Sequence, residues 1–175
     1  MSRPTIRPRD RSDLPSCAAV LTRVHAKSGY PVGGVANCVP FLTGPSILTA
    51  WVATLGSSPE DIIGHIALSS PDVSDPAVKL WYEQNGQDGQ PIAVLGRLFV
   101  DPGAQGKGAA ADLIKAVVEE ARTKGWRLVL FALVKDQGAM RLYERLGWDV
   151  YGRDVYHYGE GKKQSMEAVC YVSPK

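Results

Sequence analysis

The sequence predicts an α+β protein in which helices cover both faces of a mixed sheet of about seven strands, a three-layer α/β/α arrangement. Apolar, β-branched stretches alternate along the chain with amphipathic stretches of helical periodicity. Two of the stretches, 92–100 and 128–134, are almost wholly apolar, as expected of strands that are buried on both faces. A chain of 175 residues fits one domain of ordinary size, so we expect a single domain over residues 1–175.

The individual elements follow from these patterns and from turn-forming residues between them. The predicted strands cover 5–7, 47–55, 62–68, 92–100, 128–134, 150–158 and 166–172. The predicted helices cover 14–25 (capped by Ser12 or Asp13), 106–124 and 137–146. Segments 26–45 and 69–91 are rich in Gly, Pro and polar residues, so we expect loops with a short helix near Val39 and a helical turn over 78–82. Gly96, inside a predicted strand, indicates a bulge.

Composition excludes several classes of protein. The net charge of +2 is too small to indicate a nucleic-acid partner, and the apolar runs are shorter than a membrane span needs. Arginines near the N-terminus are followed by no apolar run, so we expect no signal peptide. The 3 cysteines are widely spaced, which argues against disulfides and against a zinc site. We therefore expect a cytoplasmic protein with no bound metal and no nucleic-acid or membrane partner.

A glycine-rich loop joins the strand 92–100 to the helix 106–124. Glycines at a helix start let the backbone approach a ligand, and the free N–H groups with the helix dipole favour a phosphate or pyrophosphate. A Walker A loop does not fit, because Gly108 rather than Ser or Thr follows Lys107. The segment 106–111 satisfies a relaxed dinucleotide fingerprint, but the acidic residue that should follow, Asp136, comes too late.

Two motifs resemble the GNAT superfamily of N-acetyltransferases. The segment 105–110 reads QGKGAA and matches the acyl-CoA loop Q/R-x-x-G-x-G/A, and 139–148 reads AMRLYERLGW, similar to the family segment A-x-x-L-Y-E-K-L-G-F. The resemblance is close over 92–148. It implies a mostly antiparallel sheet whose fourth and fifth strands splay apart, and acetyl-CoA as cosubstrate.

The resemblance also implies a set of residues that bind acetyl-CoA. They are Leu98, Phe99, Val100, Gln105, Gly106, Lys107, Gly108, Ala109, Ala110, Asp136, Ala139 and Tyr143. The pantetheine arm is expected to pair with the strand edge at Leu98 and Val100, and one N–H there would polarise the thioester carbonyl. Lys107 adds charge to the loop or is a solvated surface lysine. Asp136, where the family often has Asn, is also suited to cap a helix.

Tyr143 is the predicted general acid, because the matching tyrosine of the family protonates the departing thiolate. The alternative is a tyrosine that fills the core. The fourth strand lacks the glutamate that some members use as general base. His65 is the candidate that replaces it, although a half-buried strand histidine bonded to backbone is an equal reading, and a water chain needs no base.

The acceptor is expected to be a primary amine, either of a small molecule or of a protein. By resemblance, its binding site is expected to involve Tyr30, Trp51 and Glu83, with Tyr156 as a further candidate. Each aromatic residue can equally belong to the core. A homodimer is left open. The alternative to an enzyme is a non-catalytic acyl-CoA-binding sensor or partner module that keeps this fold.

Overall fold

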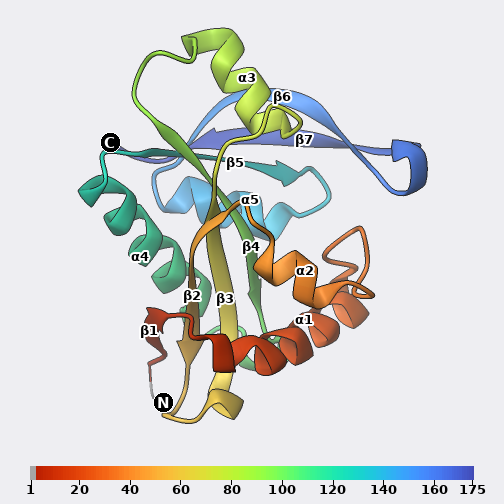
Figure 1. Ribbon diagram of the computed structural model, residues 1–175, viewed down its shortest axis with the longest axis vertical. Coiled ribbons are helices and arrows are strands. Elements are labelled where there is room, and N and C mark those ends of the chain that lie inside the picture. The colour runs from red at the N-terminus through yellow and green to blue at the C-terminus, as the bar shows by residue number, and fades with distance from the viewer. Residues whose placement is uncertain (1–2) are drawn as a thin grey trace. The chain divides into compact units, whose positions relative to one another are not determined.

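The computed structural model describes residues 3–175 and contains a seven-stranded mixed sheet. The strands follow the order β1-β2-β3-β4-β5-β7-β6 (Figure 1). The pairs β1–β2, β2–β3, β5–β7 and β6–β7 are antiparallel, whereas β4 and β5 are parallel. This arrangement confirms the predicted α+β class and its mixed, mostly antiparallel sheet.

The bounds of the elements lie close to the predictions, except for the length of α3 and the start of α4. The strands are β1 (Thr5–Pro8), β2 (Ile47–Thr54), β3 (Ile62–Ser69), β4 (Ile92–Val100), β5 (Arg127–Leu133), β6 (Asp149–Tyr158) and β7 (Gln164–Val172). The α-helices are α1 (Leu14–Ser28), α2 (Cys38–Thr43), α3 (Pro76–Asn85), α4 (Ala109–Thr123) and α5 (Gln137–Arg145). Single 3-10 turns are η1 (Arg11–Asp13), η2 (Pro59–Asp61), η3 (Pro102–Ala104) and η4 (Glu160–Lys162).

The described chain forms two compact units that share β4 and α4. Unit 1 contains the residues up to Ser69 together with Gly96–Val117, and unit 2 contains Ser70–Leu95 and Val118–Lys175. The parallel β4–β5 ladder lies in unit 2 and covers Ile92–Val94, the first third of β4. The single domain over residues 1–175 stays a prediction.

Unit 1 is built as three layers. On one face of its strands, apolar residues of α1 and Leu42 of α2 pack against Val52 and Phe99. Side chains alternate between the two faces of a strand, so Gly64 lies on the face opposite that of His65. A Cβ atom at Gly64 would lie 3.2 Å from Leu113 Cδ1 of α4. The helix α4 therefore packs closely on that second face.

Unit 2 has its core between α3 and the strands β5, β6 and β7. Ala77 and Val78 of α3 pack with Val129 and Cys170. The Tyr151 hydroxyl donates a hydrogen bond to the carbonyl of Ala77 at 2.5 Å. Figure 1 shows β6 and β7 as a long hairpin, whose strands pair from Asp149–Val172 to Tyr158–Gln164.

The helical turn predicted over 78–82 lies inside α3, but the helix is longer than predicted, with 10 residues in a segment expected to be mostly loop. Asp75 accepts a hydrogen bond from the N–H of Ala77, and Pro76 occupies the first helical position. Both residues are typical of a helix start. The helix has a short apolar face, which the surrounding polar residues concealed in the sequence. The start of α4 also moves, from 106 to Ala109, because Gly106 and Gly108 have positive φ angles of 85° and 83°.

The close approach of α4 to β3 makes Gly64 a site of high sensitivity to substitution. We expect Gly64→Ala to lower the free energy of unfolding by about 1–3 kcal/mol, since the added methyl group meets Leu113, Val100 and the Phe99 carbonyl at 3.2–3.4 Å. Gly33→Ala is the control, because nothing lies within 4 Å of a Cβ there. Urea unfolding of both variants measures the difference. Equal stabilities of the two variants would contradict the packing argument.

Candidate functional site

The glycine-rich loop is fixed at its start by contacts within unit 1. Before the loop, the Asp101 N–H donates to the Ile63 carbonyl at 2.7 Å, and its carboxylate pairs with Arg23 of α1 at 2.6 Å. The same carboxylate accepts a hydrogen bond from the N–H of Gly103. Arg23 and this turn bond together lower the pKa of Asp101, so the carboxylate is ionised at neutral pH. The turn that leads into the loop is therefore held to α1 and β3.

The loop itself has the geometry of a site for an anion. Gly106 and Gly108 adopt positive φ angles, and a Cβ atom at either would meet nothing within 4 Å. Gln105, Gly106 and Gly108 are exposed. The first N–H groups of α4 have no partner inside the helix, and the first bond closes only from Asp112 to the Gly108 carbonyl. Open space therefore lies beside free backbone donors, and this arrangement fits a pyrophosphate.

An acidic residue in the first turn of α4 is neutralised. Arg3 donates two hydrogen bonds to the carboxylate of Asp112, at 2.7 and 3.0 Å. Arg3 lowers the pKa of Asp112 and keeps it ionised, but the paired charge weakens its repulsion of an anion near the loop. Lys107 is half-buried.

The part of β4 that belongs to unit 1 contains a local kink at Arg97, whose φ angle is 51°. The mid-strand Gly96 predicted a bulge, and the positive φ falls on the residue after it. Phe99 is buried in the core of unit 1 and stacks on His65 at 5.0 Å between ring centroids. Leu98 and Val100 alternate with it, so their side chains lie on the other face of the strand.

His65 is fully buried, and both of its ring nitrogens have partners. Nδ1 lies 2.8 Å from the Arg97 carbonyl, and Nε2 lies 2.9 Å from Arg9 Nη1. Because a guanidinium can only donate, Nε2 is the acceptor and Nδ1 carries the proton. Burial, helped by the charges of Arg9 and Arg97, lowers the pKa of His65 to about 4, although the bond to the Arg97 carbonyl opposes this. The imidazole is therefore neutral at physiological pH.

Two arginines that the sequence patterns did not indicate as site residues lie beside His65. Arg9 Nη1 also donates to the Leu42 carbonyl at 2.8 Å, and Arg97 Nε donates to the Phe41 carbonyl at 2.5 Å. Both side chains are half-buried. A usable signal for Arg97 was its position as a lone charge inside an apolar strand. Arg9 had no comparable signal, since it is one of several arginines near the N-terminus.

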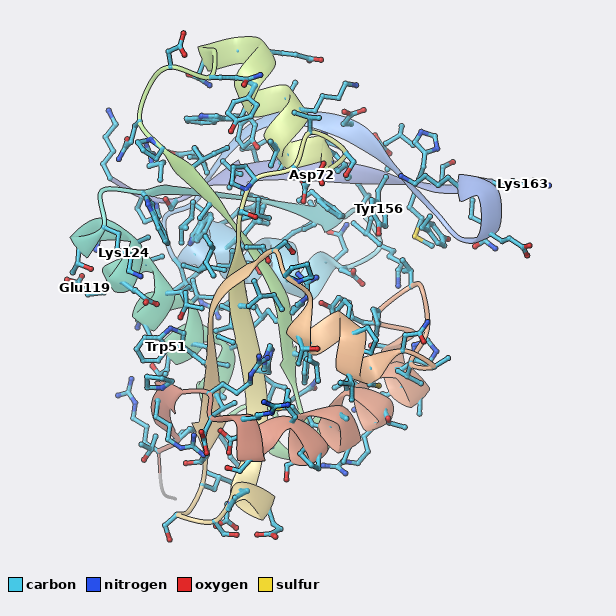
Figure 2. The ribbon with its side chains drawn as sticks, viewed as in Figure 1. Trp51, Asp72, Glu119, Lys124, Tyr156 and Lys163 are labelled. Carbon is cyan, nitrogen blue, oxygen red and sulfur yellow. The ribbon has the colours of Figure 1, made fainter. Side chains whose placement is uncertain are left out.

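The predicted acceptor residues do not all come together. Tyr30 contacts the ring of Phe41 edge-on at 6.4 Å, close to the arginines, because Arg97 lies over the same ring at 4.9 Å. Trp51 alternates with Val52 on β2 and so lies on the opposite face of unit 1; Figure 2 shows its side chain pointing away from α2. Glu83 is exposed on α3 in unit 2.

The remaining predicted residues belong to unit 2. Tyr143 on α5 is only 5% exposed, and its ring contacts Trp148 edge-on at 5.5 Å. Asp136 precedes α5 at the cap position, but its side chain forms no cap hydrogen bond. Its Oδ1 instead lies 3.6 Å from Lys135 Nζ. Ala139 lies on the first turns of α5. Tyr156 stacks on Tyr158 and contacts Phe131 at 4.7 Å; Figure 2 shows it on β6.

The fold is that of solved N-acetyltransferases. The Arabidopsis thaliana protein NAA60, solved with a bisubstrate analogue, matches with a TM-score of 0.70 and 21% identity over 97% of this chain and 96% of that one. NAA60 has also been solved with acetyl-CoA, and that structure matches with a TM-score of 0.70 and 19% identity over 97% of both chains. The ribosomal-protein-S18-alanine N-acetyltransferase of Escherichia coli matches with a TM-score of 0.67 and 18% identity over 98% and 93%.

Sequence comparison gives the family. The model of the acetyltransferase (GNAT) family matches residues 37–148, which include the glycine-rich loop and α5. The chain therefore belongs to the GNAT acetyltransferase family. A curated relative, the uncharacterized N-acetyltransferase MJ1207 of Methanocaldococcus jannaschii, is 37% identical over 59 residues. That match covers 33% of this chain and 26% of the length of the relative. No helix among residues 3–175 is long and apolar enough to cross a membrane.

The buried, neutral His65 makes stability sensitive to acid. Its pKa is about 4 in the folded protein and 6.5 in the unfolded chain, so the unfolded chain binds more protons between these values. We expect the free energy of unfolding to fall as the pH drops from about 6.5 to about 4. Burial raises the pKa of Asp75 to about 6, which acts in the opposite direction over the same range.

The measurement is urea unfolding between pH 4.5 and 7.5 of the wild type and of His65→Asn, whose amide can still donate to the Arg97 carbonyl. The variant should lose less stability on acidification than the wild type. Asp75→Asn is the control, and it should lose more. Parallel pH profiles for wild type and His65→Asn would show that the histidine is not the acid-sensitive group.

Proposed function

We propose that the protein is an N-acetyltransferase that moves an acetyl group from acetyl-CoA to a primary amine by direct attack. The observation that carries the proposal is the match of the acetyltransferase family model across the loop 105–110, together with the open, glycine-built geometry of that loop. Bound acetyl-CoA supplies the acetyl thioester. A cytoplasmic location and an acceptor amine from a small molecule or a protein remain predictions.

Backbone groups of the loop would hold the cosubstrate. The N–H groups of residues 105–110 and of the first turn of α4 are proposed to donate to the pyrophosphate oxygens. Leu98 and Val100 are proposed to pair with the pantetheine arm through their backbone, with Phe99 fixing the strand from the core. One N–H of this strand would donate to the thioester carbonyl as negative charge develops on its oxygen.

Tyr143 is proposed as the general acid. The acceptor nitrogen forms a bond to the acetyl carbon, the carbon–sulfur bond breaks, and the Tyr143 hydroxyl protonates the departing thiolate. Asp136 and Ala139 are proposed to contact the cosubstrate from the start of α5. Trp51 and Glu83 stay predictions as acceptor contacts.

The surroundings of His65 support a route for the amine proton that does not use this residue. The prediction that His65 is the general base stays open to test, but the geometry favours a different role. Its ring is 0% exposed, and each nitrogen already has a hydrogen-bond partner. We propose that water accepts the amine proton, with no dedicated side-chain base.

Cosubstrate binding is tested at Gly108. We expect Gly108→Asp to abolish acetyl-CoA binding, since a carboxylate would enter the open space beside the free N–H groups. Gly125→Asp is a matched control, because Gly125 also has a positive φ and open space but lies beyond the other end of α4. In a thermal-shift titration, ligand at about 100 times its Kd stabilises a protein by about 2.7 kcal/mol.

Acetyl-CoA and CoA should stabilise the wild type and Gly125→Asp, while NAD and ATP should not. Gly108→Asp should show no shift with any of the four. Unchanged acetyl-CoA affinity in Gly108→Asp would remove the loop from the binding site. A shift with NAD alone would instead support a dinucleotide site.

Catalysis is tested at Tyr143 by thiol release from acetyl-CoA in the presence of a panel of amines. We expect Tyr143→Phe to lower kcat by about a hundredfold or more, while acetyl-CoA affinity stays close to that of the wild type. Tyr158→Phe, on β6, is the control and should keep wild-type kcat. Loss of folding in Tyr143→Phe would support the core-filling role. Acetyl-CoA binding without thiol release with any amine would support a non-catalytic binding module.

A further inference from the structure

Arg9 and Arg97 bring two positive charges together on the face of unit 1 that α1 and α2 cover. They come from distant parts of the sequence, the end of β1 and the middle of β4. His65 joins them, since it accepts from Arg9 Nη1 and donates to the Arg97 carbonyl. Each arginine also donates to a carbonyl near the end of α2, and Arg97 Nη1 donates to Ser69 Oγ at 3.2 Å.

The charge of Arg9 is not balanced by an acidic side chain. Among residues 3–175, Arg9 forms no ion pair, and Asp13, whose charge acts on Arg9 from further away, is held by two hydrogen bonds from Arg7 at 2.7 and 2.9 Å. Partial burial lowers the pKa of Arg9, and the charge of Arg97 lowers it further. Keeping a half-buried guanidinium beside a second one is unfavourable, so the pair is well placed to receive an anion.

The free donors of Arg9 have the right shape for a carboxylate. Both of its hydrogen bonds to protein use Nη1, so the edge formed by Nε and Nη2 has no partner among the described residues. Two parallel N–H groups on one edge of a guanidinium match the two oxygens of a carboxylate. Lysine would not offer this geometry.

The position of the arginines points to the acceptor rather than to the cosubstrate loop. Arg97 lies over the ring of Phe41, and Tyr30, a predicted acceptor contact, meets the same ring. Arg97 also precedes Leu98, whose backbone is proposed to lie along the acyl-bearing arm. An acceptor bound at the arginines would therefore have its other end near the strand that is proposed to present the thioester.

We propose that Arg9 and Arg97 form a subsite for a carboxylate of the acceptor, so that the acceptor is a small amine that also carries a carboxylate group, such as an amino acid. This inference rests on the proposed acetyl transfer. Arg9 binds the carboxylate through its Nε–Nη2 edge, and Arg97 adds charge. The neutral His65 orients Arg9 and lets the two cations stand close together without adding a third charge.

A purely structural role for the arginines gives different results. The two side chains could serve only to bind the last carbonyls of α2, which is a common role for arginine at a helix end. In that case, removing the charge of Arg9 would weaken the binding of every acceptor by a similar factor and would lower the free energy of unfolding. A carboxylate subsite instead makes the effect depend on the acceptor.

The experiment compares amino acids with their carboxamides, which differ only in the carboxylate, on the full chain. Calorimetry measures the binding of each unacetylated compound, and thiol release from acetyl-CoA measures transfer. The variants are Arg9→Gln, which can still donate to the Leu42 carbonyl, Arg9→Lys, which keeps the charge, and Arg11→Gln, an exposed control. Urea unfolding checks that each variant is folded.

We expect at least one amino acid to bind about tenfold to a hundredfold more tightly than its carboxamide. Arg9→Gln should remove that difference by weakening the binding of the amino acid and not that of the carboxamide, and Arg9→Lys should restore part of the difference. Arg11→Gln should keep both the difference and the wild-type kcat. The subsite would be overturned if wild-type protein bound amino acids and carboxamides equally tightly. It would also be overturned if Arg9→Gln weakened the binding of both by the same factor.

The two proposals fail in distinguishable ways. Binding of an amino acid that depends on Arg9, without any thiol release, would overturn the acetyl transfer and leave the carboxylate subsite in place. Transfer to carboxamides and amino acids at equal rates would overturn the subsite and leave the transferase. Transfer only to a peptide that lacks any carboxylate would likewise overturn the subsite.

Discussion

A hydrogen bond from a buried, uncharged imidazole fixes the middle of β4. The Arg97 carbonyl accepts from His65 Nδ1 at 2.8 Å, at the one residue of the strand whose φ is positive. Two residues later, Phe99 stacks on the same imidazole. A strand held at both positions has little freedom at Leu98 between them, where a backbone N–H is proposed to act. Pre-organised donors contribute to catalysis because they need not reorient as charge develops.

The arginines near the N-terminus divide into balanced and unbalanced charges. Arg3 pairs with Asp112 in the first turn of α4, and Arg7 of β1 pairs with Asp13 of η1. Arg3 is largely exposed, so its pair with Asp112 contributes little to stability and mainly cancels local charge, whereas Asp13 is buried in its pair with Arg7. Cancelling Asp112 benefits an anion at the start of α4. Arg9 differs because its partners are a carbonyl and a neutral ring, which leave its charge available.

The sequence predicted those parts of the fold whose local signals agree with their tertiary environment. The strand 92–100, the glycine-rich loop and the helix after it have apolar spacing and turn residues that favour the same structure the core requires. The candidate residues of the loop and Tyr143 were predicted from their match to the family motifs. The helix α3 was predicted only as a helical turn over 78–82, although Asp75 and Pro76 are good start signals, because only its first turn is fully buried and its polar surroundings resemble a loop.

The cluster around His65 could not be predicted in the same way, because its members depend on long-range contacts. The residues Arg9, His65 and Arg97 are separated by more than thirty positions at each step, as the separations of 56 and 32 in their hydrogen bonds show. A histidine on a strand is compatible with a base, a ligand or a core residue, and only its neighbours decide. Here complete burial and the two adjacent arginines keep the imidazole of His65 neutral.

This balance of charges also constrains how the acceptor end of the reaction responds to pH. The guanidinium groups stay charged across the physiological range even where burial lowers the pKa of Arg9, and His65, with a pKa of about 4, stays neutral. A carboxylate bound to Arg9 is ionised at neutral pH as well. None of the groups in the proposed subsite therefore changes charge between pH 6 and pH 9. A rise of activity with pH in that range would have to come from deprotonation of the attacking amine, which is consistent with water, rather than His65, as the acceptor of its proton.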